Sequence, residues 1–154
     1  MCIEVASDDG MRILLDLGMP LYDANHEDFP RDTQQRPTCE LIAEKVLPDV
    51  TSLYADDPAA PTFAAIILTH AHLDHYGLAH HAHPDIPVYG SRGTIALLEV
   101  GRVFFPDAAL LRDLCELPEG GPLLIGSLAI RSGTWAMPPR SPPTSSPRTP
   151  AHTS

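Results

Sequence analysis

The residues of this chain best suited to chemistry lie together in residues 69–77, whose sequence is THAHLDHYG. The segment holds three histidines and one aspartate within six positions: His70, His72, Asp74 and His75. Neutral imidazole nitrogens and carboxylate oxygens are ligands that zinc and similar divalent cations prefer. The apolar run at residues 63–68 predicts a buried strand, so the four side chains follow a strand end, from which they can converge. We therefore predict a metal site at these four residues.

The spacing of the four residues indicates which of their side chains can face the same point. Residues two apart in extended backbone point the same way, so His70 and His72 can chelate one ion. Asp74 and His75 lie near the start of a helix predicted over residues 73–80, and they can face a neighbouring ion. A solvated polar loop is the alternative, and this spacing directly after a buried strand argues against it. The remaining histidines are interpreted as surface or tail residues: His26, His80, His81, His83 and His152.

The pattern His-x-His-x-Asp-His resembles the signature of the metallo-β-lactamase superfamily. Residues 13–18, ILLDLG, resemble the family's second-strand motif, an apolar strand that ends in an aspartate and a glycine near the metal centre. The long, Pro-rich interval between Asp16 and His70 is similar to that of the ribonuclease J-like branch. The resemblance covers residues 2–131 and implies an α/β fold, the first half of an incomplete αββα metallo-β-lactamase sandwich.

This resemblance implies roles for the site residues. It assigns His70 and His72 to one zinc ion and Asp74 and His75 to a second, with manganese as an alternative metal and Asp74 as a catalytic residue. Two cations about 3.5–4 Å apart would share a water and produce a metal-bound hydroxide, which in this branch attacks a phosphodiester, as in RNA. Asp16 is expected to orient a ligand imidazole by accepting its other N–H, the alternative being a strand-end aspartate that simply meets a turn.

Two other functions stay open. The same four ligands serve family members that hydrolyse thioesters or lactones. The second alternative is a non-catalytic fragment that at most binds metal or another chain. Family members complete both metal sites with later ligands, whereas the only histidine after residue 83 is His152. Because catalytic zinc usually has three protein ligands, we expect weak metal affinity and little or no hydrolysis by this chain, as for a truncated enzyme.

The composition changes after residue 131. Residues 132–154 contain six prolines and nine Ser or Thr, with no Leu, Ile, Val, Phe or acidic residue. Such a segment cannot bury enough apolar surface to offset its ordering entropy, so we expect a disordered tail. The sequence thus predicts a partial domain over residues 1–131 and a tail over residues 132–154. This tail is typical of frame-shifted translation, and a linker to a partner is the alternative.

Charge and cysteine content limit the partners. Residues 1–131 carry eight Lys or Arg against twenty Asp or Glu, a net charge of −12, which disfavours DNA and strong nucleic-acid binding. Expected partners are a small-molecule or RNA substrate, and a second copy through exposed half-sheets. Three scattered cysteines fit a reducing, cytoplasmic setting. The sequence shows no signal peptide and no apolar run long enough to span a membrane.

The remaining elements follow from turn and capping signals. Residues 3–6 and 11–17 predict a hairpin across the Asp-Gly turn at residues 7–10. Helices are expected over residues 38–46 and from Ser91 or Thr94 to about Phe104. Further strands are predicted at residues 87–89, 123–125 and 128–130, the last two as a hairpin.

Overall fold

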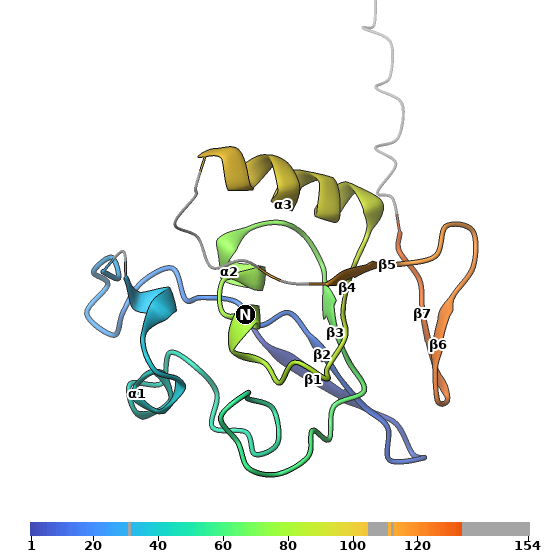
Figure 1. Cartoon of the computed structure of the whole chain (residues 1–154), viewed down its shortest axis with the longest axis horizontal. Coiled ribbons are helices and arrows are strands. Elements are labelled where there is room, and N and C mark those ends of the chain that lie inside the picture. Colours follow the sequence, from blue (N-terminus) through green and yellow to red (C-terminus); the bar gives the residue numbers. More distant parts are fainter. Residues whose placement is uncertain (31, 105–110, 112, 134–154) are drawn as a thin grey trace, which may run out of the picture.

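A five-stranded mixed sheet forms the centre of the computed structural model, which describes residues 1–30, 32–104, 111 and 113–133 (Figure 1). The strands neighbour one another in chain order: β1 (Ile3–Ala6), β2 (Arg12–Leu15), β3 (Ala65–Leu68), β4 (Val88–Gly90) and β5 (Leu114–Glu116). β1 pairs with β2 antiparallel, and the other pairs are parallel. The carboxyl ends of β2 and β3 therefore meet at one edge of the sheet, as the parallel arrangement requires.

Both faces of the sheet are covered. Along β3 the side chains alternate: Ile66 and Leu68 belong to one core cluster, and Ala65 and Ile67 belong to another. The first cluster packs under the helices and the loops that connect them. The second packs against a hairpin of β6 (Leu123–Ile125) and β7 (Leu128–Ile130). The predicted α/β class is thus confirmed, as a mixed sheet between a helical layer and a hairpin.

The longest helix, α3 (Arg92–Phe104), contacts β4 and β5. Of the two predicted N-cap residues, Ser91 caps the helix, because its Oγ accepts a hydrogen bond from the Thr94 N–H at 3.1 Å. Helix α1 (Thr38–Ala43) is three residues shorter than the predicted 38–46. The chain leaves helical geometry at Lys45, whose φ is 61°.

The helix predicted over residues 73–80 is wrong in its length. The structure has a four-residue helix α2 (Leu73–Tyr76), a turn, and a 3₁₀ helix η2 (Ala79–His81). A continuous helix would pair the Leu78 N–H with the Asp74 carbonyl. Instead the Leu78 N–H donates to the Leu17 carbonyl at 3.0 Å, and the Asp74 carbonyl accepts from the Met1 ammonium at 2.6 Å. Tertiary partners thus end the helix.

Other predictions were confirmed or fall outside the described part. The two hairpins form where predicted, across residues 7–10 and across residues 126–127, although β2 covers only residues 12–15 of the predicted 11–17. Neither β5 nor the 3₁₀ helix η1 (Thr33–Gln35) was predicted from the sequence. Residues 134–154 of the predicted tail lie outside the described residues. Within the described residues, no helix is long and apolar enough to cross a membrane.

Candidate metal centre

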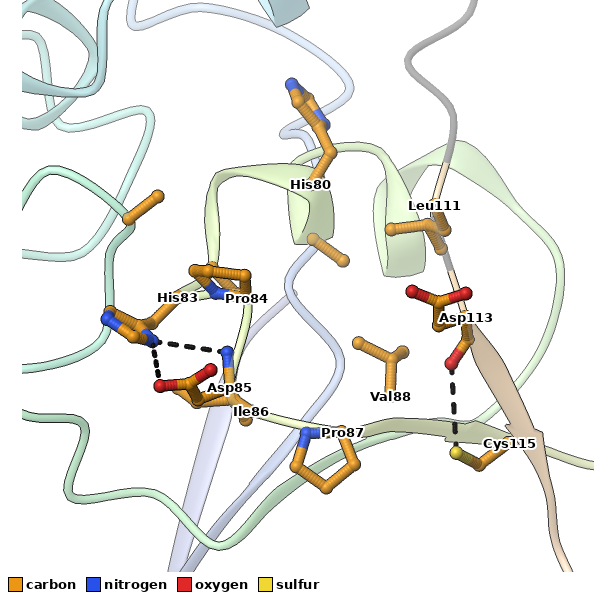
Figure 2. A pocket seen from close by; sticks show the side chains of 13 residues that line it. His80, His83, Pro84, Asp85, Ile86, Pro87, Val88, Leu111, Asp113 and Cys115 are labelled. Atoms are coloured by element: carbon orange, nitrogen blue, oxygen red, sulfur yellow. Dashed lines mark hydrogen bonds and ion pairs between the residues drawn. The ribbon is translucent and has the colours of Figure 1, made fainter.

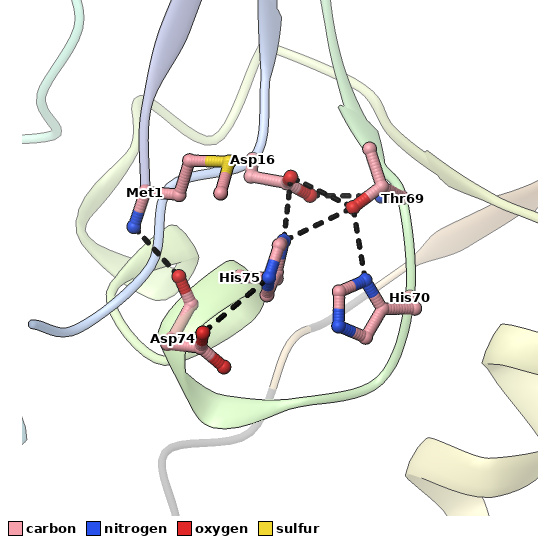
Figure 3. A network of polar contacts seen from close by, with 6 residues as sticks. All are labelled: Met1, Asp16, Thr69, His70, Asp74 and His75. Carbon is pink, nitrogen blue, oxygen red and sulfur yellow. Dashed lines mark hydrogen bonds and ion pairs between the residues drawn. The ribbon is translucent and has the colours of Figure 1, made fainter. Parts of the chain in front are cut away.

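Three of the four predicted ligands converge at the carboxyl ends of β2 and β3 (Figure 3). His70 lies in the loop after β3, and Asp74 and His75 lie in α2. One ligand atom from each of these residues lies within 4.8 Å of the others. The rings of His70 and His75 have centroids 3.6 Å apart, and His75 Nε2 is 3.4 Å from Asp74 Oδ2. Within the described part of the chain, no other group of three metal-type ligands is this close.

His72 lies beside this cluster but outside it. Its ring contacts the His70 ring edge-on, with centroids 4.6 Å apart, and its side chain is exposed. Residues 70–72 form a bend in which His72 itself keeps extended backbone, with φ −98° and ψ 148°. His72 occupies the N-cap position of α2. The geometry therefore groups His70 with Asp74 and His75.

Asp16 is a buried carboxylate that contacts the cluster through His75. Its side chain is only 1% exposed, and its Oδ2 lies 2.8 Å from His75 Nδ1. Its backbone N–H continues the sheet by donating to the Ile67 carbonyl at 3.0 Å, and its φ of 60° is one that aspartate tolerates better than most residues. The hydrogen bond that an orienting role requires is therefore present between Asp16 and the imidazole of a candidate ligand, His75.

The segment after Asp16 fixes α2 in place. The Leu17 N–H donates to the His75 carbonyl at 2.9 Å, and the Met19 N–H donates to the Leu73 carbonyl at 3.1 Å. Between them Gly18 presses on the backbone of Asp74, where an added Cβ would lie 1.7 Å from the Asp74 carbonyl oxygen. Only glycine permits this approach, so the Asp-x-Gly motif sets both the position of the Asp16 carboxylate and that of the helix that carries two candidate ligands.

The electrostatics favour the neutral form of His70. Partial burial and then the neighbouring imidazoles of His75 and His72 lower the pKa of His70, against the opposing effect of Asp16 and Asp74. Metal binding requires the neutral imidazole, so a lower pKa keeps more of this ligand available. Two imidazoles and one carboxylate around one point match the donor set of catalytic zinc, which leaves a further position for solvent. The residues present therefore fit a divalent ion.

The contacts of Thr69, His80 and His81 were not foreseen from the sequence. Thr69, between the buried strand and His70, contacts Asp16, His70 and His75. His80 and His81 were interpreted as surface residues, and this was wrong: both are half-buried, and both Nε2 atoms contact the Gln34 carbonyl, at 2.7 and 2.9 Å. Burial lowers the pKa of His80 to about 4. No local sequence pattern predicts the contacts with Asp16 and Gln34, because these partners are 46 to 53 residues away in the sequence.

A second feature is a cavity of about 730 Å³ between η2, the 82–87 loop and strands β4 and β5 (Figure 2). Most of its lining is apolar. Its polar groups include His83, whose Nδ1 lies 3.7 Å from Asp85 Oδ2, and Cys115, whose Sγ contacts the Asp113 carbonyl. None of the predicted metal ligands lines it. The site predicted from the sequence and this cavity are therefore distinct features.

Comparisons with known proteins support the fold alone. No family model matches the sequence, and no curated protein matches it. Among solved structures, the chain is similar to a protein of unknown function from Enterococcus faecalis, with a TM-score of 0.57 and 23% sequence identity. The similarity covers 83% of this chain and 32% of that protein, so the chain spans about a third of its neighbour's length. At this identity the likeness concerns architecture and not activity.

Proposed function

We propose that this chain carries a divalent-metal centre of the metallo-β-lactamase type and that its chemistry is metal-dependent hydrolysis. One observation carries the proposal: His70, Asp74 and His75 offer ligand atoms within 4.8 Å of one another, and a buried aspartate holds one of the imidazoles. An ordinary polar surface loop is not expected to combine three metal-type donors with a buried carboxylate, because burying that charge costs free energy unless it is paired.

The arrangement of the sheet supports the family assignment. A strand–Asp-x-Gly segment and a strand–His-x-His-x-Asp-His segment end at the same sheet edge, because β2 and β3 are parallel neighbours. The β6–β7 hairpin packs on the opposite face from the helices, where the second sheet of an αββα sandwich would begin. We propose the incomplete sandwich on this basis.

Each residue would have a distinct part. His70 and His75 would bind the ion through nitrogen and Asp74 through oxygen, and His72 would join them by turning its ring, which already touches His70. Asp16 would hold His75 in one orientation. Zinc is the ion proposed, with manganese as the alternative, and a bound divalent ion would supply Lewis acidity and lower the pKa of a water molecule. Asp74, a half-buried member of the cluster, is also the proposed catalytic carboxylate.

Zinc binding tests the metal centre. The purified chain is dialysed against zinc and its bound metal is measured by mass spectrometry, together with His70→Ala, His75→Ala and the control His26→Asn. His26 is exposed, and its φ of 64° suits asparagine. We expect bound zinc in the parent chain and in the control, and a loss of zinc in the other two variants. Absence of zinc from the parent, or equal zinc in all variants, would refute the centre.

Turnover tests the reaction. The zinc-loaded chain is assayed on an activated phosphodiester, on single-stranded RNA and on a thioester. The proposal expects slow phosphodiester cleavage that disappears in Asp74→Asn. Any cleavage should be slow because the chain lacks the later ligands of the family. Cleavage of the thioester alone would overturn the substrate class, and zinc binding without any turnover would favour the alternative of a non-catalytic, metal-binding fragment.

A further inference from the structure

Thr69 makes two hydrogen bonds to the buried carboxylate of Asp16 (Figure 3). Its backbone N–H donates to Asp16 Oδ1 at 2.8 Å, and its hydroxyl lies 2.8 Å from Asp16 Oδ2. An ionised carboxylate can only accept hydrogen bonds, so the single hydroxyl proton of Thr69 is committed to Asp16. Thr69 Oγ1 can then act only as an acceptor toward its other neighbours.

Two imidazole nitrogens face that oxygen. His70 Nδ1 is 3.1 Å from Thr69 Oγ1, and His75 Nδ1 is 3.0 Å from it. His75 Nδ1 has a closer and charged acceptor in Asp16 Oδ2, at 2.8 Å, and a hydrogen bond to a carboxylate is stronger than one to a hydroxyl. The His75 N–H therefore goes to Asp16. This leaves Thr69 Oγ1 to accept the N–H of His70 Nδ1.

We infer that Thr69 is a positioning residue that connects Asp16 to His70 and fixes His70 as the Nδ1–H tautomer. In that tautomer Nε2 of His70 carries no proton and can bind a metal ion. Asp16 does the same for His75 directly, so one buried carboxylate presents the Nε2 atoms of both imidazoles. As far as it concerns metal binding, the inference rests on the proposed function; the tautomer itself is a property of the metal-free chain.

The tautomer of His70 is the direct test. Nitrogen-15 NMR of the metal-free, histidine-labelled chain distinguishes Nδ1–H from Nε2–H, at a pH well above the ordinary histidine pKa of about 6.5. We expect Nδ1–H for both His70 and His75 in the parent chain. Thr69→Val keeps the backbone N–H bond to Asp16 and removes the hydroxyl, so His70 should shift toward Nε2–H while His75 stays Nδ1–H.

Two variants separate this role from a structural one. Thr69→Ser restores a hydroxyl at the same position and should return His70 to Nδ1–H. Thr62→Val removes another exposed threonine hydroxyl, one that accepts from Arg12 Nη1 at 2.8 Å, and should leave His70 unchanged. An Nε2–H tautomer of His70 in the parent chain, or no change in Thr69→Val, would overturn the inference.

Zinc affinity then tests the consequence for binding. Removing a group that orients a metal ligand typically weakens affinity about 10–100-fold, and we expect this for Thr69→Val with recovery in Thr69→Ser. If the parent chain binds no zinc, the proposed function fails, whereas the tautomer result still decides the role of Thr69. A tautomer change in Thr69→Val with undiminished zinc affinity would overturn the positioning role.

Discussion

Asp16 is the residue on which the candidate centre depends most. It is buried, yet it accepts hydrogen bonds from the Thr69 backbone and hydroxyl and lies against His75, so its charge has partners on both oxygens. Because β2 places it at the sheet edge and its left-handed backbone turns the chain there, the same residue serves the fold and the cluster. Its effects on folding and on metal binding can be separated by replacing the carboxylate with the amide of asparagine.

Asp16→Asn should lower zinc affinity by about 10–100-fold while leaving the chain folded. Asparagine adopts the same left-handed backbone, but it carries no negative charge to stabilise the orientation of His75. Competition with a chromophoric chelator measures the affinity, and circular dichroism checks the fold. The control is Asp85→Asn, at an exposed carboxylate outside the cluster. Equal zinc affinity in Asp16→Asn and the parent would show that Asp16 does not orient a ligand.

His80 should make stability depend on pH. Burial holds its folded-state pKa at about 4, below the ordinary value of about 6.5. Below pH 6.5 the unfolded chain binds a proton that the folded chain refuses, so the stability from neutral His80 is complete above about 6.5 and is lost as the pH falls toward 4. His80→Gln should flatten the fall of Tm across this range. His26→Asn is the control, and a parallel fall in His80→Gln would contradict the assignment.

At the scale of elements, the loop at residues 17–19 and α2 form one unit. Two backbone hydrogen bonds join them, from the N–H groups of Leu17 and Met19 to α2, and the Leu78 N–H in the turn after α2 donates back to the Leu17 carbonyl. The glycine between them lets the two backbones touch. This contact both ends α2 after one turn and brings Asp74 and His75 to the sheet edge.

Gly18→Ala should therefore damage both stability and zinc binding. The added methyl would lie 1.7 Å from the Asp74 carbonyl oxygen, so α2 must move away, at a cost of about 1–3 kcal/mol. Urea unfolding measures the loss, and a zinc titration measures the displacement of the ligands. The matched control is Gly121→Ala, which has open space around it and should change neither. A parent-like Gly18→Ala variant would show that the two backbones are not held in contact.

Elements whose formation depends on neighbouring residues can be predicted from the sequence, whereas those fixed by contacts with distant residues cannot. The strand before His70 and the hairpin across Gly126 follow from apolar runs and turn residues, and both form as expected. The single-turn length of α2 comes from Leu17 and Met1, which lie far from it in the sequence, so no local signal marks the break. The sequence predicts that His70, His72, Asp74 and His75 follow the end of β3, whereas the closer grouping of His70, Asp74 and His75 depends on how α2 packs at this sheet edge.

At the scale of the whole molecule, charge is the dominant feature. The chain carries a net charge of −10, while the candidate substrate class includes an anionic polymer. Like charges repel over roughly a Debye length of about 10 Å in dilute salt, so the protein surface works against RNA while the metal cluster would attract it. Any contact with RNA should therefore be local to the cluster.

The salt dependence of RNA binding should accordingly be opposite to that of basic nucleic-acid-binding proteins, whose affinity falls steeply with salt. Fluorescence anisotropy of labelled single-stranded RNA with the zinc-loaded chain should show weak binding that holds or strengthens as salt is added, because salt screens the repulsion. An uncharged thioester substrate gives the reference, since its binding should hardly change. Affinity that falls steeply with salt would reveal a basic binding surface and contradict this account.

The most direct measurement of the central claim is the zinc-edge X-ray absorption spectrum of the zinc-loaded chain, since it reports the atoms bound to the ion. The convergence of His70, Asp74 and His75 predicts imidazole nitrogens together with oxygen, and one imidazole fewer in either His70→Ala or His75→Ala. A spectrum with oxygen ligands alone, or one identical in the parent and both variants, would contradict a metal centre at the ends of β2 and β3.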